Sequence, residues 1–376
     1  TALLGLAAGF QSLNPAFAAD AALPADTQPG RTIGKFSIYG QLNYGFMSMN
    51  DGFDSETVFA DNDNSSTRFG IKGELPLTSW LKAGGKYEAE VEVNSSARVS
   101  IQDPNISKIL SVRKFEGWAE VKVATVVTVR VTGGQGSTAS DGSSEQDLSG
   151  TKVIGYSNVA ALGSAIRYRN ETTAAVSGFQ VGKVFSNLDG FSRDNRVRVD
   201  VRSGGVTIAG SVINNQRWDI AGFIKHSIND VIKVAAAISY GDDNRTAGAG
   251  FTQTSGSLSV LHVPTGLSVT GAAGLRNSEV AGRNDRTFLY GKLAIMRHML
   301  TDEGKTGFAA DYMVTEDALT NGDRGKSVGV FAVQRVDRYN AELFAGYRQF
   351  DYSRPGGTSF SRVRVFMTGA RVKFKS

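Results

Sequence analysis

The residues that could do chemistry in this 376-residue chain are its charged side chains, because the patterns for metal and phosphate binding are weak. The chain has no cysteine, and its three histidines, His226, His262 and His298, lie far apart without the short spacings of a metal site. The glycine-rich run 133–138 (GGQGST) contains no lysine, which a phosphate loop needs. We therefore predict that the chain is not an enzyme and holds neither a cofactor nor a metal.

The charges are spread along the chain and differ in sign between its two parts. The whole sequence has 41 Lys and Arg against 36 Asp and Glu, a net charge of +5. Residues 1–150 hold 12 basic and 17 acidic residues, a balance of −5, whereas residues 151–376 hold 29 and 19, a balance of +10. Because the basic residues are dispersed among acidic ones rather than clustered, no nucleic-acid partner is predicted.

Many charged residues occupy alternate positions, which indicates strands. In 81–93, apolar residues or glycine at the odd positions alternate with Lys, Gly and Glu at the even ones. In 196–202, three valines alternate with three arginines and an aspartate. Successive side chains of a strand point to opposite faces, so one face of such a strand is apolar and the other is charged.

The predicted strands are long enough to cross a membrane. Many run for 10–13 residues, whereas strands of soluble proteins are commonly about 5–6 residues long and a tilted membrane strand needs about 9–11. We predict 18 strands, or 16 if one doubtful hairpin is merged. Their ranges are 36–49, 65–75, 80–93, 111–122, 126–132, 164–170, 174–186, 193–203, 205–214, 217–226, 230–241, 249–263, 266–277, 284–296, 305–316, 324–335, 338–350 and 361–374.

The connections differ in length at the two ends of these strands. Short turns, such as 203–205 and 227–229, alternate with mostly longer polar loops, such as 50–64 and 133–163. This layout is typical of an outer-membrane barrel. A barrel of 16 or 18 strands encloses a water-filled lumen, where charged side chains stay solvated. We therefore predict one all-β domain over residues 36–374, a transmembrane antiparallel up-and-down β-barrel.

The first residues are predicted to be an export signal. Residues 1–18 are uncharged and read as the remnant of a signal peptide, truncated at its start, because the run 16–18 (Ala-Phe-Ala) fits a peptidase site before Ala19. Residues 19–35 contain two prolines and read as a loose lead-in to the barrel. The alternative is a buried apolar N-terminus.

Several segments resemble a Gram-negative general porin of the alphaproteobacterial type. They are 38–43 (IYGQLN), 65–74 (SSTRFGIKGE), 145–151 (EQDLSGT) and the end of the last strand, 370–374 (ARVKF). Their order and spacing extend the resemblance over about 36–374. Such porins usually finish on an aromatic residue that the outer-membrane assembly machinery reads. The resemblance gives this role to Phe374, although Lys375 and Ser376 follow it here.

The resemblance implies a homotrimer of 16-stranded barrels in the outer membrane of a Gram-negative bacterium, each barrel with its own pore. In such porins the third external loop folds inward and narrows the channel, with acidic groups facing Lys and Arg on the wall. The longest connection here, 133–163, follows the fifth predicted strand and matches that loop in order. It carries the candidate constriction acids Asp141, Glu145 and Asp147.

Strand parity gives the basic side chains that would face this loop. The candidates from strands two to five are Arg68, Lys72, Lys86, Lys114 and Arg130. The later strands add a second basic wall with Arg167, Arg169, Arg196 and Arg198. Opposed rows of charge set ion preference and orient dipolar solutes. We expect a weak preference for anions; the alternative is that some of these groups lie at the rims and bind lipopolysaccharide phosphates.

The predicted function is passive diffusion of small hydrophilic solutes and ions through a water-filled pore. One alternative is a substrate-selective channel for sugars or an anion such as phosphate, which a count of 18 strands would favour. A non-channel outer-membrane adhesin or structural barrel is an alternative of another class, and a soluble β-sandwich or solenoid is the last. The predicted partners are further copies of the chain, outer-membrane lipid, lipopolysaccharide and the assembly machinery.

Overall fold

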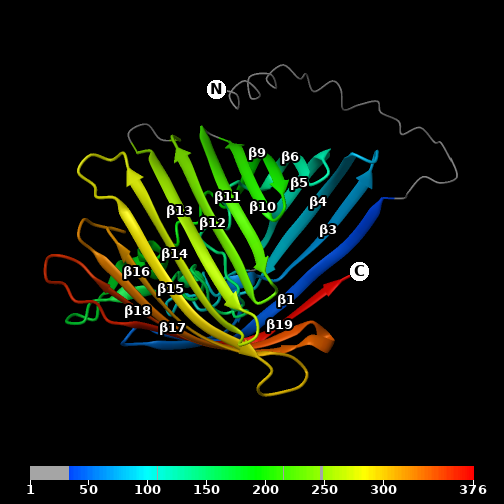
Figure 1. Cartoon of the computed structure of the whole chain (residues 1–376). Coiled ribbons are helices and arrows are strands. Elements are labelled where there is room, and N and C mark those ends of the chain that lie inside the picture. The colour runs from blue at the N-terminus through cyan, green and yellow to red at the C-terminus, as the bar shows by residue number, and fades with distance from the viewer. Residues whose placement is uncertain (1–33, 108, 215, 246–248) are drawn as a thin grey trace. The chain divides into compact units, whose positions relative to one another are not determined.

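A single antiparallel sheet closes on itself as a barrel (Figure 1). The computed structural model describes residues 34–107, 109–214, 216–245 and 249–376. The predicted signal remnant and all but the end of the lead-in lie outside the described residues. The barrel strands are β1 (Lys35–Asn50), β2 (Ser55–Asp61), β3 (Arg68–Pro76), β4 (Leu81–Glu92), β5 (Ile109–Ala124), β6 (Val127–Ser137), β9 (Arg193–Ser203), β10 (Val206–Ile213), β11 (Arg217–Ile228), β12 (Ile232–Asp243), β13 (Phe251–His262), β14 (Leu267–Ser278), β15 (Arg286–Arg297), β16 (Thr306–Glu316), β17 (Arg324–Val336), β18 (Ala341–Ser353) and β19 (Val363–Lys375).

The barrel wall counts as 16 strands, because β2 and β3 lie end to end along β1 and together form one strand of the wall. β3 pairs with the first part of β1 and β2 with its second part. β1 also pairs with β19, from Tyr39↔Lys375 to Asn50↔Arg364, which closes the ring. Each of the other strands pairs with the next barrel strand along the chain. The predicted all-β antiparallel barrel is therefore confirmed, and 16 is the correct count.

Two of the 18 predicted strands, 164–170 and 174–186, do not belong to the wall. Their residues form a short hairpin of β7 (Arg167–Arg169) and β8 (Val176–Gln180), which is a separate two-stranded sheet, and the one-turn helix α2 (Val181–Val184). β6 pairs directly with β9 instead. Alternation of buried and exposed residues is the same in a hairpin that packs against the connections of a barrel, so the sequence pattern could not separate the two cases.

A turn separates β2 from β3 within the wall strand that they form together. Residues 62–67 contain the short 3-10 helix η2 (Asp63–Ser65), and its N-cap Asn62 accepts a hydrogen bond from Asn64 N (3.1 Å). Asn62 Nδ2 donates to Val153 O (2.8 Å), which ties the turn to the chain inside the barrel. The predicted loop 50–64 is shorter than expected because β2 occupies much of it.

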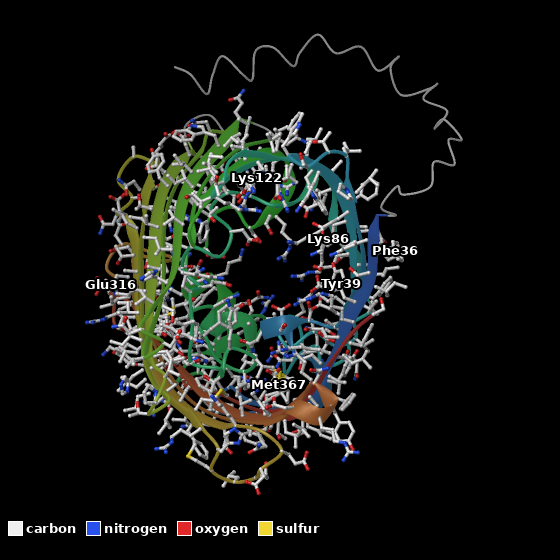
Figure 2. All side chains as sticks on the ribbon, turned by 45° about the vertical axis from the view of Figure 1, so that its right-hand side comes forward. Phe36, Tyr39, Lys86, Lys122, Glu316 and Met367 are labelled. Carbon is white, nitrogen blue, oxygen red and sulfur yellow. The ribbon has the colours of Figure 1, made fainter. Side chains whose placement is uncertain are left out.

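The outer face of the barrel is apolar, as the alternation predicted. Phe36, Leu42 and Phe46 lie on the same face of β1 and are 66%, 59% and 61% exposed. Phe36 points away from the barrel in Figure 2. Large apolar side chains are exposed in this way on strands all round the barrel. Soluble monomers rarely expose so much apolar surface, whereas a barrel in lipid does.

The inward side chains differ between two parts of the barrel. The packed half consists of β14–β19 with β1 and β2, and its inward side chains, such as Met313, Phe331 and Met367, are 0%, 4% and 0% exposed. The open half consists of β3–β6 and β9–β11, and many of its inward side chains are charged, although those of β10 are not. Figure 2 shows an opening beside Tyr39 and Lys86, whereas side chains crowd the interior near Met367.

The two ends of the barrel chain meet beside the seam between β1 and β19. Ser376 N donates to Ile38 O (2.9 Å) just beyond the last strand. α2 spans four residues, and none of the helices within the described ranges has the length and apolar character to cross a bilayer.

Candidate functional site

A long segment inside the barrel shapes the candidate site. This inner segment (residues 138–192) leaves the wall after β6 and returns at β9, and Thr138 N donates to Ser192 O (2.9 Å) where its two ends meet. The predicted inward folding of the third long loop is confirmed, but the segment is longer than the predicted 133–163. Because most of it is irregular, its backbone N–H groups need hydrogen-bond acceptors elsewhere.

A row of serines on the inner wall supplies part of this need. Gln146 N donates to Ser257 Oγ (2.9 Å), and Leu148 N donates to Ser259 Oγ (2.9 Å). A hydroxyl can donate and accept at once, so it satisfies an irregular loop without adding charge. The whole serine row, each of whose members contacts the stretch 139–148, consists of Ser211, Ser239, Ser255, Ser257 and Ser259.

Asp147, a predicted constriction acid, anchors the inner segment instead of facing the lumen. Its carboxylate pairs with Lys292 Nζ of β15 at 2.8 Å, and the two side chains are 2% and 1% exposed. Lys292 Nζ also donates to Gly155 O (2.6 Å). Burial alone would raise the pKa of Asp147, but the charge of Lys292 and the hydrogen bonds from Lys292 and Ser149 hold it below its usual value.

Three cavities lie along the open half of the barrel, and one of them also borders β1 and β19 at the seam. Their volumes are about 750, 590 and 450 Å³. Arg68 lines both the 750 Å³ and the 590 Å³ cavity, and Asp141 lines both the 590 Å³ and the 450 Å³ cavity. These two residues therefore lie where neighbouring cavities meet. The candidate constriction runs between the basic wall at β3 and the inner segment.

The predicted basic wall lines these cavities, but acids neutralise much of it. The paired bases are Lys72 with Glu74 (3.1 Å), Lys86 with Glu88 (3.2 Å) and Arg130 with Glu120 (2.6 Å). Within the described ranges, Arg68 and Lys114 form no ion pair; Lys114 Nζ donates to Ser137 Oγ instead (3.1 Å). The field across the lumen is therefore weaker than a count of basic residues suggests.

A β-bulge adds a cation that strand parity missed. The register between β4 and β5 shifts after Glu88, and Arg113 is the extra residue. Arg113 and Lys114 therefore both lie on the inner face, although they are adjacent in sequence. Arg113 pairs with Glu88 (3.2 Å) and with Glu90. A strict period of two gives no sign of such a bulge.

The other two predicted loop acids do reach the cavities. Asp141 is partly buried and lies at the junction described above. Glu145 lines the 590 Å³ cavity, and its carboxylate pairs with Lys152 Nζ at 3.2 Å. Asp141 is therefore the loop acid best placed to oppose the unpaired Arg68 and Lys114.

Asp189 is an acid of the inner segment that the sequence reasoning missed. Its carboxylate accepts hydrogen bonds from Gly142 N (2.8 Å) and Ser144 N (3.0 Å), which fixes the turn after Asp141. Burial, with the nearby charges of Glu145 and Asp141, raises its pKa well above the usual range. Asp189 lies more than 40 residues from that turn along the chain, so no local sequence pattern connects the two.

The four members of the predicted later basic wall have different places. Arg196 and Arg198 lie in β9 and line the 450 Å³ cavity. Arg196 Nη1 donates to Gly134 O of β6 (2.7 Å), whereas Arg198 Nη1 donates to Thr138 O (2.6 Å) and so holds the start of the inner segment.

The prediction is wrong for Arg167 and Arg169, which belong to β7, a strand that is not part of the barrel wall. Arg169 pairs with Asp51 (2.7 Å) and with Asp54, in the connection between β1 and β2, and Arg167 is exposed. Both residues have the alternation of a wall strand, but their hairpin has no hydrogen-bonded neighbour among the barrel strands. Arg169 therefore ties the hairpin to the end of the barrel.

Two further sequence features have structural roles. Phe374 is 48% exposed on the outer face, and its ring covers Gly40, where a Cβ would lie 2.3 Å from Phe374 Cζ. Its role in assembly stays a prediction. The run 325–329 (GKSVG) has the Gly-x-Ser-x-Gly spacing of a hydrolase nucleophile. It lies within β17, however, where Ser327 is 0% exposed and accepts a hydrogen bond from Arg348 Nη1 (2.9 Å).

Comparison with known proteins shows the fold. No protein-family model and no curated protein sequence matches the chain. The anion-selective porin of Comamonas acidovorans has a similar structure, with a TM-score of 0.60 and 12% identity over 91% of this chain and 100% of that chain. A loop L8 deletion mutant of the outer-membrane protein OmpT of Vibrio cholerae gives a TM-score of 0.59 at 14% identity, over 91% and 100% of the two chains. The fold of this chain is that of outer-membrane porins.

A third solved structure agrees. OprB of Pseudomonas putida has a TM-score of 0.58 and 11% identity, over 91% of this chain and 94% of that chain. Nearly the whole length of each protein is matched in the three comparisons, so the likeness covers the complete barrel and not a few hairpins.

Proposed function

We propose that this chain is an outer-membrane channel through which small hydrophilic solutes and ions diffuse passively. The observation that carries the proposal is the series of adjoining cavities along the open half, lined by charged side chains, in a barrel whose outer face is apolar. Charged groups keep their hydration in a water-filled lumen, so they stay there without the cost of burial. Buried apolar side chains fill the interior beside β14–β18, which directs passage along the open half.

The proposal includes a weak preference for anions. The 450 Å³ cavity next to Asp141 is lined by six basic side chains, among them Lys114 and Arg130, and by only three acidic ones. Part of this excess is cancelled locally, because Arg130 pairs at 2.6 Å with Glu120, which is not one of the three lining acids. The remaining positive charge attracts anions without forming a site that would hold them tightly.

Single-channel recording of the purified protein in a planar lipid bilayer tests the proposal. We expect a stable open level whose current rises linearly with salt concentration. A reversal potential in a KCl gradient should have the sign of anion preference, and clear cation preference would contradict this part. Saturable current that a sugar or phosphate blocks would favour a substrate-selective channel. The absence of any stable open level would favour an adhesin or structural barrel.

The proposal also places the chain in the outer membrane of a Gram-negative bacterium as a homotrimer. The supporting observation is structural similarity to the trimer form of OmpT of Vibrio cholerae, with a TM-score of 0.57 at 14% identity. Lys326, exposed on the outer face near the start of β17, is available to a lipopolysaccharide phosphate. Trimer mobility on an unheated gel that changes to monomer mobility after boiling is the expected result.

A further inference from the structure

Three carboxylates converge beside the turn that interrupts β2 and β3. Asp63 belongs to η2, whereas Glu90 and Glu92 lie two positions apart on the same face of β4. One carboxylate oxygen of each residue lies within 4.8 Å of those of the other two. Glu90 and Glu92 are buried and Asp63 is partly buried. Like charges this close repel one another strongly where water is excluded.

The protein balances only part of this charge. Glu90 pairs with Arg113, but Asp63 and Glu92 form no ion pair within the described part of the chain. Glu92 is 7% exposed, and its Oε1 has no hydrogen-bond partner. A buried carboxylate oxygen without a partner is strongly unfavourable. Glu92 therefore presents an unused acceptor to a group that already carries excess negative charge.

The backbone holds the three side chains in place from two directions. Asp63 N donates to Ser96 Oγ (2.9 Å), and Asn62, the N-cap of η2, is tied to Val153 O. Glu90 stands where β4 pairs with both β3 and β5, and Glu92, two residues further on, pairs with β5. Ligands on such fixed elements make a preformed site, because little ordering remains to be done on binding.

We propose that Asp63, Glu90 and Glu92 bind one divalent cation, for which Ca²⁺ is the best match. Ca²⁺ takes carboxylate oxygens at about 2.3–2.6 Å, so oxygens on opposite sides of one ion lie about 5 Å apart. The spread of 4.8 Å fits this geometry. Mg²⁺ needs about 2.0–2.1 Å and gives up its water reluctantly, so it fits less well. The 590 Å³ cavity, which Asp63 and Glu90 line, connects the site with the lumen.

A shared proton between Asp63 and Glu92 is the competing arrangement, since it would also relieve the repulsion. Calorimetric titration of the purified full chain in detergent, treated with EDTA and held at about pH 7.5, separates the two. We expect one saturable Ca²⁺ site per chain. The Glu92→Gln variant, which keeps the shape of the side chain, should bind Ca²⁺ at least about tenfold more weakly. The Glu120→Gln variant removes a lumen carboxylate from a different ion pair and should bind like the parent.

Thermal unfolding without calcium shows whether both variants are folded. No saturable binding by the parent chain, or equal binding by the parent chain and Glu92→Gln, would overturn the proposal and favour the shared proton. The site does not depend on the proposed function. An open channel that binds no calcium rejects the site alone, whereas calcium binding by a barrel without conductance supports the site and rejects the channel.

Discussion

The packed half and the open half of the barrel carry the same alternating sequence pattern but use their inner faces in opposite ways. In the packed half, side chains such as Met313 and Phe331 meet the apolar side of the inner segment, including Ile154 and Phe185. In the open half, the inward positions carry charge beside cavities. The pattern specifies that one face is lipid-facing, but it leaves open whether the other face is dry or wet.

Ion pairs show the difference in energetic terms. Lys292 with Asp147 and Arg348 with Asp311 (2.7 Å) have side chains no more than 2% exposed. Removal of one partner of a buried ion pair strongly destabilises the folded protein, because the other partner is left charged and unpaired. The open-half pair of Lys86 and Glu88 keeps more contact with water, with Lys86 22% exposed. Substitutions in the packed half should therefore change stability, and those in the open half should change selectivity.

The largest effect is expected for Lys292→Met. It leaves Asp147 buried without its cation and should lower the free energy of unfolding by about 3–5 kcal/mol. Denaturant or thermal unfolding in detergent measures the loss, and single-channel recording should show a noisier open level as the inner segment loosens. The double variant Lys292→Met with Asp147→Leu should regain most of the stability. A loss from Lys86→Met as large as that from Lys292→Met would break the comparison of the two halves.

Met313→Ala tests the packing itself. Met313 is 0% exposed, so its truncation should cost about 2–5 kcal/mol through lost contacts and a cavity. The matched control is Val330→Ala on the outer face, where the side chain is 49% exposed and detergent fills the space in this measurement. Unfolding in detergent compares the two variants. A large change in conductance by Met313→Ala would contradict a pore that is confined to the open half.

Ser259→Ala tests the serine row at the border of the two halves. It removes the acceptor of Leu148 N, which should weaken docking of the inner segment by about 1 kcal/mol. Amide hydrogen exchange at Leu148 should become roughly fivefold faster, since about 1 kcal/mol corresponds to a factor of about 5. The exposed Ser227→Ala is the control. Unchanged exchange at Leu148 would show that other contacts alone hold the segment.

Lys114→Gln should have the smallest effect on stability and a clear effect on selectivity. Lys114 lines the 450 Å³ cavity and forms no ion pair among the described residues, so we expect a stability change below about 1 kcal/mol. Its loss removes positive charge from the lumen, and the reversal potential in a KCl gradient should shift toward cations. Lys326→Gln on the outer face should leave that potential unchanged. Equal shifts in both variants would mean that surface charge, not the lumen wall, sets the preference.

Much of the wall could be predicted from the sequence because strand period is a local property. The alternation in 81–93 placed the polar and apolar faces of β4 correctly, and the predicted range 193–203 coincides with β9. Prediction failed where a third element decides the outcome. Arg113 reaches the lumen face through a β-bulge in the pairing of β5 with β4. The predicted strands 164–170 and 174–186 form a hairpin outside the wall, because β9 pairs with β6 in their place.

The sequence by itself determined a long-stranded barrel with an apolar exterior, charged inner positions and a long connection after the fifth strand. Only the tertiary structure decided which charges meet water. Asp147 and Asp141 are six residues apart in the same loop, yet one is buried against Lys292 and the other lies at a junction of cavities. The physical reason is that the solvation of a side chain depends on what lies across the lumen from it. Contacts with strands distant in sequence fix which side of the lumen the inner segment packs against.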